Sequence, residues 1–161
     1  MVKLEEYLNQ DIDQPKYLFH GSPYLLDKLS PRKSHDDENK SNEDLAIFLF
    51  PMFRKVTPYA LRNAFSQKVD GIAKEDSYFS TTLKGKTYPF ATIKNRIINQ
   101  DEKGYVYVFL RDETMIKDND SYQYRCYHEL VPIDIIEVRF KDFVDDFEII
   151  QDNEKIKHSN L

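Results

Sequence analysis

The sequence of 161 residues lacks tryptophan and contains a single cysteine, Cys126, so an internal disulfide is excluded. Its four glycines form neither a G-x-G-x-x-G pattern nor a P-loop, which removes the common glycine-rich phosphate-binding motifs. No stretch approaches the roughly 18 apolar residues of a membrane-spanning helix, and the N-terminal segment MVKLEEYLNQ has no apolar signal region. We therefore expect a cytoplasmic protein with no membrane partner.

Positive charge is also scarce, with 23 Lys and Arg against 28 Asp and Glu and a net charge of −5. The basic residues are scattered, so an extended nucleic-acid surface is not expected. The single cysteine has no second thiol beside it, and no metal site is expected. Instead the chain is rich in aromatic residues, with 11 Tyr and 11 Phe, which predicts an aromatic core. Its length predicts one domain that buries roughly 70% of its unfolded surface.

The most informative stretch is AIFLFPMFRKVTPYALRN, residues 46–63. Five consecutive apolar residues, 46–50, are typical of a buried strand. Apolar residues then recur at three- and four-residue steps, which predicts a helix. Thr57 suits the N-cap and Pro58 the first helical position, so we predict that the regular helix begins there.

The rest of the chain predicts mainly strands, and therefore an α+β fold with a largely antiparallel sheet. A strand over residues 17–20 should be broken by Gly21 and Ser22. The run 105–110 is apolar on both faces, which indicates a central strand, and residues 135–140 alternate as in a half-buried strand. Further strands are predicted at 77–82 and in the extended segment 121–131; short helices are predicted at 2–9, 91–99 and 141–147. Residues 32–44 carry no apolar residue and predict a mobile loop, and the tail from residue 151 should fray.

Three motifs, in this order, resemble those of the ADP-ribosyltransferases of the diphtheria-toxin and poly(ADP-ribose) polymerase type. The first is YLFHGS, which contains His20 and resembles the family's His-Gly-Ser/Thr strand. The second is the IFL strand with Phe48 and, in the following helix, Tyr59. The third is YHELV, whose Glu129 resembles the catalytic glutamate on a late strand in an apolar setting. Together they match the family's His–Tyr–Glu signature.

The resemblance implies a single ADP-ribosyltransferase-like domain over residues 1–161, with two packed, mostly antiparallel sheets around a cleft and a few short helices. It also implies NAD-dependent ADP-ribosyl transfer, either mono-ADP-ribosylation or NAD hydrolysis, with NAD as the substrate. Breaking the bond between nicotinamide and ribose passes through an oxocarbenium-like transition state, as in glycoside hydrolysis. A carboxylate near the ribose stabilises that positive charge.

The family implies a role for each matched residue. Glu129 would be catalytic, accepting a hydrogen bond from the nicotinamide-ribose 2′-OH and stabilising the developing cation. The remaining positions would bind NAD: His20 at the adenine-side ribose, Gly21 through its backbone at the nicotinamide amide, Ser22 as the continuation of that motif, Tyr59 by stacking on nicotinamide, Phe48 as the strand aromatic, and Thr57 in place of a hydroxyl residue that the family often has at the position of Val56.

Each assignment has a structural alternative. His20 can be a core histidine, Phe48 and Tyr59 core aromatics, and Glu129 an edge-strand residue facing solvent. Tyr127, two residues before Glu129, argues against the arginine- and asparagine-directed toxins, which carry Glu or Gln there. At the level of function the alternative is a non-catalytic module of the same fold that binds a partner or a nucleotide. An RNA 2′-phosphotransferase of related fold would need clustered Arg and His, which the sequence does not have.

Overall fold

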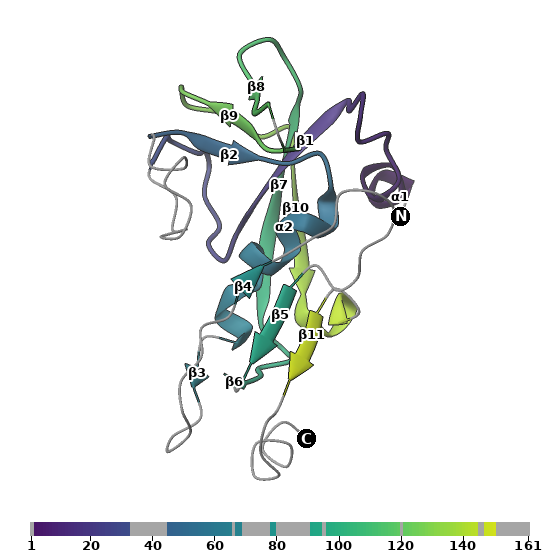
Figure 1. Cartoon of the computed structure of the whole chain (residues 1–161), viewed down its shortest axis with the longest axis vertical. Helices are drawn as coiled ribbons and strands as arrows, with labels where there is room; N and C mark the ends of the chain where they lie inside the picture. Colours follow the sequence, from purple (N-terminus) through teal and green to yellow (C-terminus); the bar gives the residue numbers. More distant parts are fainter. Residues whose placement is uncertain are drawn as a thin grey trace. The chain divides into compact units, whose positions relative to one another are not determined.

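The computed structural model of the chain describes residues 2–32, 45–65, 67–68, 78–79, 91–94, 96–119, 121–144 and 147–150. Within these ranges the fold is α+β, with many short strands and few helices (Figure 1). Most of the loop expected at 32–44, most of the strand expected at 77–82 and the tail from residue 151 lie outside the described residues. In chain order the elements are α1 (Val2–Leu8), β1 (Tyr17–Ser22), β2 (Ile47–Leu49), α2 (Phe53–Ala60), the 3-10 turn η2 (Arg62–Phe65), β3 (Gln67–Lys68), β4 (Tyr78–Phe79), β5 (Ala91–Lys94), β6 (Arg96–Ile97), β7 (Lys103–Leu110), β8 (Ile116–Lys117), β9 (Tyr124–Cys126), β10 (Asp134–Arg139), the 3-10 turn η3 (Phe140–Asp142) and β11 (Phe147–Ile150).

The strands described group into four small sheets, with orders β1-β7-β10, β11-β5-β4, β2-β9-β8 and β3-β6. In the sheets β2-β9-β8 and β3-β6 every neighbouring pair is antiparallel. Strand β5 lies between β4 and β11, antiparallel to the first and parallel to the second (Figure 1). The predicted fold class, α+β with largely antiparallel pairing of the strands, is confirmed for the described residues.

The chain divides into two compact units, each made of three separate stretches. The first unit contains Met1–His20, Leu25–Val56 and Val106–Ile136. The second contains Gly21–Tyr24, Thr57–Tyr105 and Glu137–Leu161. His20 and Glu129 therefore belong to the first unit, and Tyr59 belongs to the second.

The first unit has an aromatic core, as the composition predicts. Val106, Tyr107, Val108 and Phe109 of β7 are buried one after another, and β7 is the middle strand of its sheet, which confirms the central strand. Around Phe19 the rings meet edge to face: the centroid distances are 5.4 Å from Phe19 to Phe53, 5.8 Å from Phe19 to Tyr7 and 4.9 Å from Tyr7 to Tyr17. Such pairs add about 0.5–1.5 kcal/mol each beyond the burial of their area.

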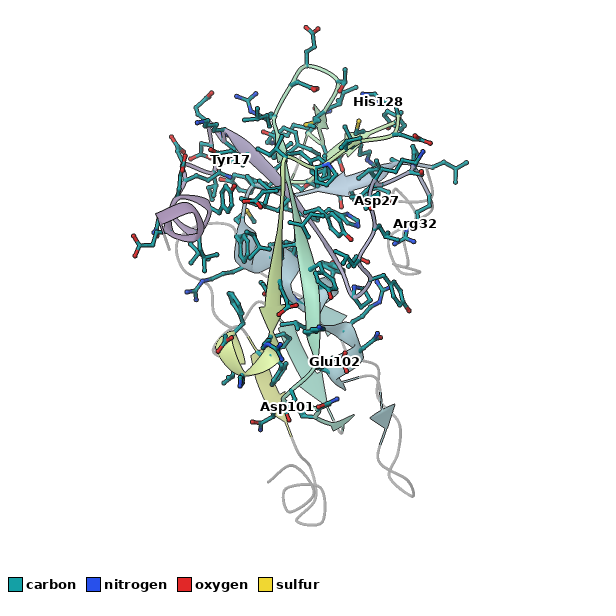
Figure 2. All side chains as sticks on the ribbon, turned by 180° about the vertical axis from the view of Figure 1, so that it is seen from behind. Tyr17, Asp27, Arg32, Asp101, Glu102 and His128 are labelled. Carbon is teal, nitrogen blue, oxygen red and sulfur yellow. The ribbon has the colours of Figure 1, made fainter. Side chains whose placement is uncertain are left out.

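The second unit packs its turns against strand ends. Phe140 of η3 and Phe147 of β11 have ring centroids 4.7 Å apart. The turn before β7, where Figure 2 labels Asp101 and Glu102, is fixed by the Phe140 N–H, which donates to the Glu102 carbonyl over 3.0 Å. Asn99 N–H donates to the Ala64 carbonyl over 2.7 Å and so ties this turn to η2.

One predicted helix is wrong. In the segment 91–99, residues 91–94 form β5 and residues 96–97 form β6. Strand β5 pairs with β11, whose residues lie more than fifty positions later, and a local apolar pattern does not reveal that pairing. In the segment 141–147, residues 141 and 142 complete η3 and Phe147 begins β11, and the helix predicted over the whole segment lies partly outside the described residues. By contrast α1 and β10 are confirmed. Among the residues described, no helix is long and apolar enough to cross a membrane.

Candidate functional site

His20 and Phe48 meet through a hydrogen bond within the first unit. The backbone bridge between Phe19 and Phe50, with N–O distances of 2.8 and 2.9 Å, aligns β1 with the chain that follows β2. The half-buried His20 ring then donates from Nδ1 to the Phe48 carbonyl oxygen over 2.8 Å. Because a carbonyl can only accept, Nδ1 carries the hydrogen, and in the neutral ring Nε2 is the acceptor atom. The fold therefore fixes the tautomer of His20.

The Phe48 ring has a neighbour that the sequence does not reveal. Its partner across the β2-β9 ladder is Arg125, whose guanidinium lies 5.3 Å from the ring centroid. Arg125 is buried, and its Nε donates to Asp118 Oδ1 over 2.9 Å. One face of Phe48 is therefore occupied by a fixed cation. The only sequence signal for this contact is a charged residue between the apolar Tyr124 and Cys126.

Glu129 does not lie on a strand, which corrects the prediction of a strand glutamate in an apolar setting. The described pairing of β9 ends at Cys126, and the chain pairs again only at the backbone bridge between Leu29 and Leu130. The Glu129 side chain is 56% exposed, and Lys28 Nζ lies 3.1 Å from its Oε2. The alternative prediction, an edge-strand glutamate facing solvent, is correct for the exposure of the side chain and wrong for the strand.

The strand is interrupted because local hydrogen bonds replace the ladder after Cys126. The Cys126 thiol donates to the His128 carbonyl oxygen over 3.7 Å. The His128 ring donates from Nδ1 to the Glu129 carbonyl oxygen over 2.8 Å, and its Nε2 lies 2.9 Å from Thr114 Oγ1. Figure 2 labels His128 on this segment. These bonds bend the chain and turn Glu129 outward.

Thr114 connects His128 to Asp112 on the loop after β7. The Thr114 hydroxyl donates to Asp112 Oδ1 over 2.5 Å, and the Thr114 N–H donates to the same oxygen over 2.8 Å. The hydroxyl bond is the main reason that the pKa of Asp112 lies below its usual range, and the charge of His128 lowers it further. The sequence carries no signal for this network, because a Thr and a His fourteen positions apart share no period.

Gly21 and Ser22 belong to the second unit and lie at the end of β1. Both are buried, and β1 continues through Ser22, so the prediction that the strand breaks at Gly21 is wrong. The Ser22 Oγ accepts a hydrogen bond from the Tyr24 N–H over 3.1 Å. This is the serine turn that a Ser-Pro sequence favours.

Thr57 and Tyr59 lie on α2, which begins at Phe53 and not at Thr57 as predicted. Pro58 is inside the helix, where it removes one backbone bond, while the buried side chains of Phe53 and Val56 anchor the preceding turn. Two positions along a helix correspond to about 200°, so Thr57 and Tyr59 point to different sides. The Thr57 side chain is fully buried and the Tyr59 side chain is half-buried.

With this geometry established, the chain was compared with known proteins. No family model, curated protein or solved structure matches it. The residues described also contain no group of three or more His, Cys, Asp or Glu that could hold a metal ion. Two sets of contacts remain as the basis for a functional argument. His20 is hydrogen-bonded to Phe48. Glu129 contacts Lys28 through its side chain and His128 through its carbonyl.

Proposed function

We propose that the chain is an NAD-dependent ADP-ribosyltransferase, or an NAD glycohydrolase, with an ADP-ribosyltransferase-like fold of two sheets around a cleft. The observation that carries the proposal is the environment of Glu129: a carboxylate on the surface, held by one exposed ion pair, at the position of the signature glutamate. The fixed tautomer of His20 at the first signature position supports it. The single cysteine is compatible with a reducing compartment such as the cytoplasm.

Glu129 would act on the ribose of NAD. The bond between ribose C1′ and the nicotinamide nitrogen breaks, and its electron pair leaves with nicotinamide. Positive charge develops on C1′ and the ring oxygen, and an acceptor nucleophile or water then adds to C1′ and loses a proton. The Glu129 carboxylate would accept the 2′-OH hydrogen bond and stabilise the charge. An exposed ion pair contributes about 0.2–1 kcal/mol, so exchanging Lys28 for a ribose hydroxyl is energetically accessible.

The other signature positions would bind NAD. His20 would contact the adenine-side ribose, Gly21 the nicotinamide amide through its backbone, and Tyr59 the nicotinamide ring. Of the three remaining candidates, Phe48 already has Arg125 over one ring face, and the side chains of Ser22 and Thr57 are buried. In the proposal Phe48, Ser22 and Thr57 would form the surroundings of the NAD site, and His20 and Tyr59 would contact NAD directly.

A second candidate function is a non-catalytic module of the same fold that binds a partner or nucleotide. The Lys28–Glu129 ion pair favours this candidate, because it already compensates the charge that catalysis would use. Val56 and the buried Thr57 favour it too, since neither places an exposed hydroxyl at the position where the family often has one.

Nicotinamide release from labelled NAD separates the two candidates. We expect turnover by the wild type, and a reduction of roughly 10²–10³-fold in E129Q, equivalent to about 2.7–4 kcal/mol, because glutamine keeps the size of the side chain and loses its charge. NAD affinity, measured by calorimetry, should change far less, since the charge matters most in the transition state. In Y59A the affinity itself should fall through loss of a stacking surface.

E113Q is the matched control, because Glu113 is an exposed glutamate of the same unit, outside the signature. Its turnover and NAD affinity should equal those of the wild type. Wild-type turnover in E129Q would refute the catalytic role of Glu129. A wild type that binds NAD without releasing nicotinamide would establish the non-catalytic module, and a wild type that does neither would remove NAD from the proposal altogether.

A further inference from the structure

The His128 ring, although exposed, uses both of its nitrogens within the protein. Side-chain hydrogen bonds at a surface usually go to water or to a nearby backbone group. Here Nδ1 bonds the carbonyl of Glu129, and Nε2 contacts Thr114 Oγ1, fourteen positions away in sequence. The ring therefore links the segment after β9 to the loop after β7.

Two hydrogens in this link can be assigned from their acceptors. The Glu129 carbonyl only accepts, so Nδ1 is a donor. The Thr114 hydroxyl has one hydrogen and donates it to Asp112 Oδ1. Nε2 lies 2.9 Å from Thr114 Oγ1, so a chain of hydrogen bonds connects the ring through Thr114 to the carboxylate of Asp112. Bonds to an ionised acceptor are about twice as strong as neutral ones, so Asp112 anchors the chain of bonds.

Glu129 is consequently held on both sides of its α-carbon. On the carbonyl side the His128 ring fixes the peptide that Glu129 shares with Leu130, and the bridge to Leu29, with N–O distances of 2.9 and 3.0 Å, fixes the next residue. On the side-chain end Lys28, next to Leu29 in the chain, meets the carboxylate. Outside a strand, Glu129 has no extended ladder to hold it, so these contacts determine where its carboxylate lies.

We propose that His128 is a positioning residue for Glu129: through Thr114 and Asp112 it orients the glutamate backbone so that the carboxylate meets the ribose of NAD. This inference rests on the proposed function. A loosely held carboxylate would still bind solvent and Lys28, but it would sample fewer productive geometries. A misplacement of about 1 Å can reduce a rate by up to about 10²-fold.

Three variants test the role by nicotinamide release. H128A removes both bonds and should lower kcat by about 10- to 100-fold, with KM for NAD nearly unchanged. H128N should recover part of the rate, because the asparagine amide can donate to the Glu129 carbonyl from about the position of Nδ1 but has no group at the position of Nε2 to contact Thr114. T114V keeps the shape of the side chain but loses the hydroxyl, so its rate should lie between those of H128A and the wild type. Urea unfolding of each variant reports whether the fold is retained.

A second readout needs no activity. Long-range ¹H–¹⁵N spectra of the wild type should show Nδ1 of His128 protonated, with H128N serving to assign the signal. An unprotonated Nδ1 would overturn the inference. Equal kcat for H128A and an active wild type would also overturn it while leaving the proposed function intact. Should H128A fail to fold, a T114V rate equal to that of the wild type would decide against the inference. A wild type that releases no nicotinamide removes the proposed function, and the positioning role falls with it.

Discussion

Substituting Gly104 by alanine tests how closely α2 packs on β7 within the second unit. A Cβ added at Gly104 would lie 1.8 Å from the Ala60 carbonyl oxygen, 2.5 Å from its carbonyl carbon and 3.1 Å from its α-carbon. All three are backbone atoms, so no side-chain rotation can relieve the overlap. Ala60 follows Tyr59 in α2, and the substitution therefore presses directly on the helix that carries the candidate nicotinamide-stacking residue.

The size of the effect follows from the overlap. Ordinary van der Waals contact begins near 3.4 Å, so the helix end must move by more than 1 Å. Forcing an extra methyl group into a packed interior destabilises by about 1–3 kcal/mol, and a clash with backbone should reach at least the upper end. Without the clash the sign would be reversed, because replacing Gly by Ala at a compatible position stabilises by about 0.4–1 kcal/mol through the unfolded state.

Urea denaturation should therefore show G104A less stable by about 3 kcal/mol, with a melting temperature lower by roughly 6–12 °C for a chain of this size. K103A is the control, because the neighbouring Lys103 is exposed and loses only a surface ion pair with Glu137, 3.5 Å away. That pair should contribute no more than about 1 kcal/mol. A G104A variant as stable as the wild type would refute the close packing of α2 on β7.

Two further predictions concern side chains that anchor the first unit. The buried Tyr7 donates to Asp134 Oδ2 over 2.9 Å, and burial together with this carboxylate raises its pKa. The neutral phenol therefore contributes fully to the stability of the fold below about pH 10, and this contribution is lost as the pH rises further. The Y7F variant should be about 1 kcal/mol less stable than the wild type at neutral pH. In urea titrations at rising pH, Y7F should also lack the alkaline loss of stability that the wild type shows. The Gln10 amide donates to the carbonyls of Tyr17 and Pro51 over 2.8 and 2.7 Å, so Q10A should lose roughly 1–3 kcal/mol, whereas the exposed control N9A should change by less than about 0.5 kcal/mol. A Q10A midpoint equal to that of N9A, or a Y7F variant that keeps the wild-type alkaline transition, would contradict these assignments.

The elements predicted correctly are those whose pattern is complete in the local sequence. The apolar runs of β2 and β7 and the alternation of β10 indicate their own burial, and β7 is the middle strand of its sheet. The helix predicted at 91–99 is wrong for the opposite reason: isoleucines spaced for a helix also suit a strand, and the parallel partner β11 decides between them. Thr57 is not an N-cap although Thr-Pro is a good helix start, because Phe53 and Val56 bury the preceding turn.

The sequence motifs name the residues of the candidate site but do not reveal their contacts. His20 and Phe48 belong to separate motifs, and the bond that joins them ends on a backbone carbonyl, which no residue type indicates. Lys28 and Arg125 appear in no motif, yet one compensates the charge of Glu129 and the other covers a face of Phe48. Long-range polar contacts of this kind depend on the fold, since residues that meet need no shared period in sequence.

The energetics of Glu129 decide how the Lys28 ion pair bears on function. An exposed pair with both side chains more than half accessible contributes about 0.2–1 kcal/mol, and salt reduces it further. Stabilisation of a developing charge by one well-placed group contributes about 2.7–4 kcal/mol to a rate. If Glu129 is catalytic as proposed, the stabilisation of the transition state would exceed that of the ion pair, and Lys28 would lower the ground state too little to prevent catalysis. What matters more is geometry, because the carboxylate is outside a strand, and its orientation depends on the bonds of His128 and the bridge at Leu130.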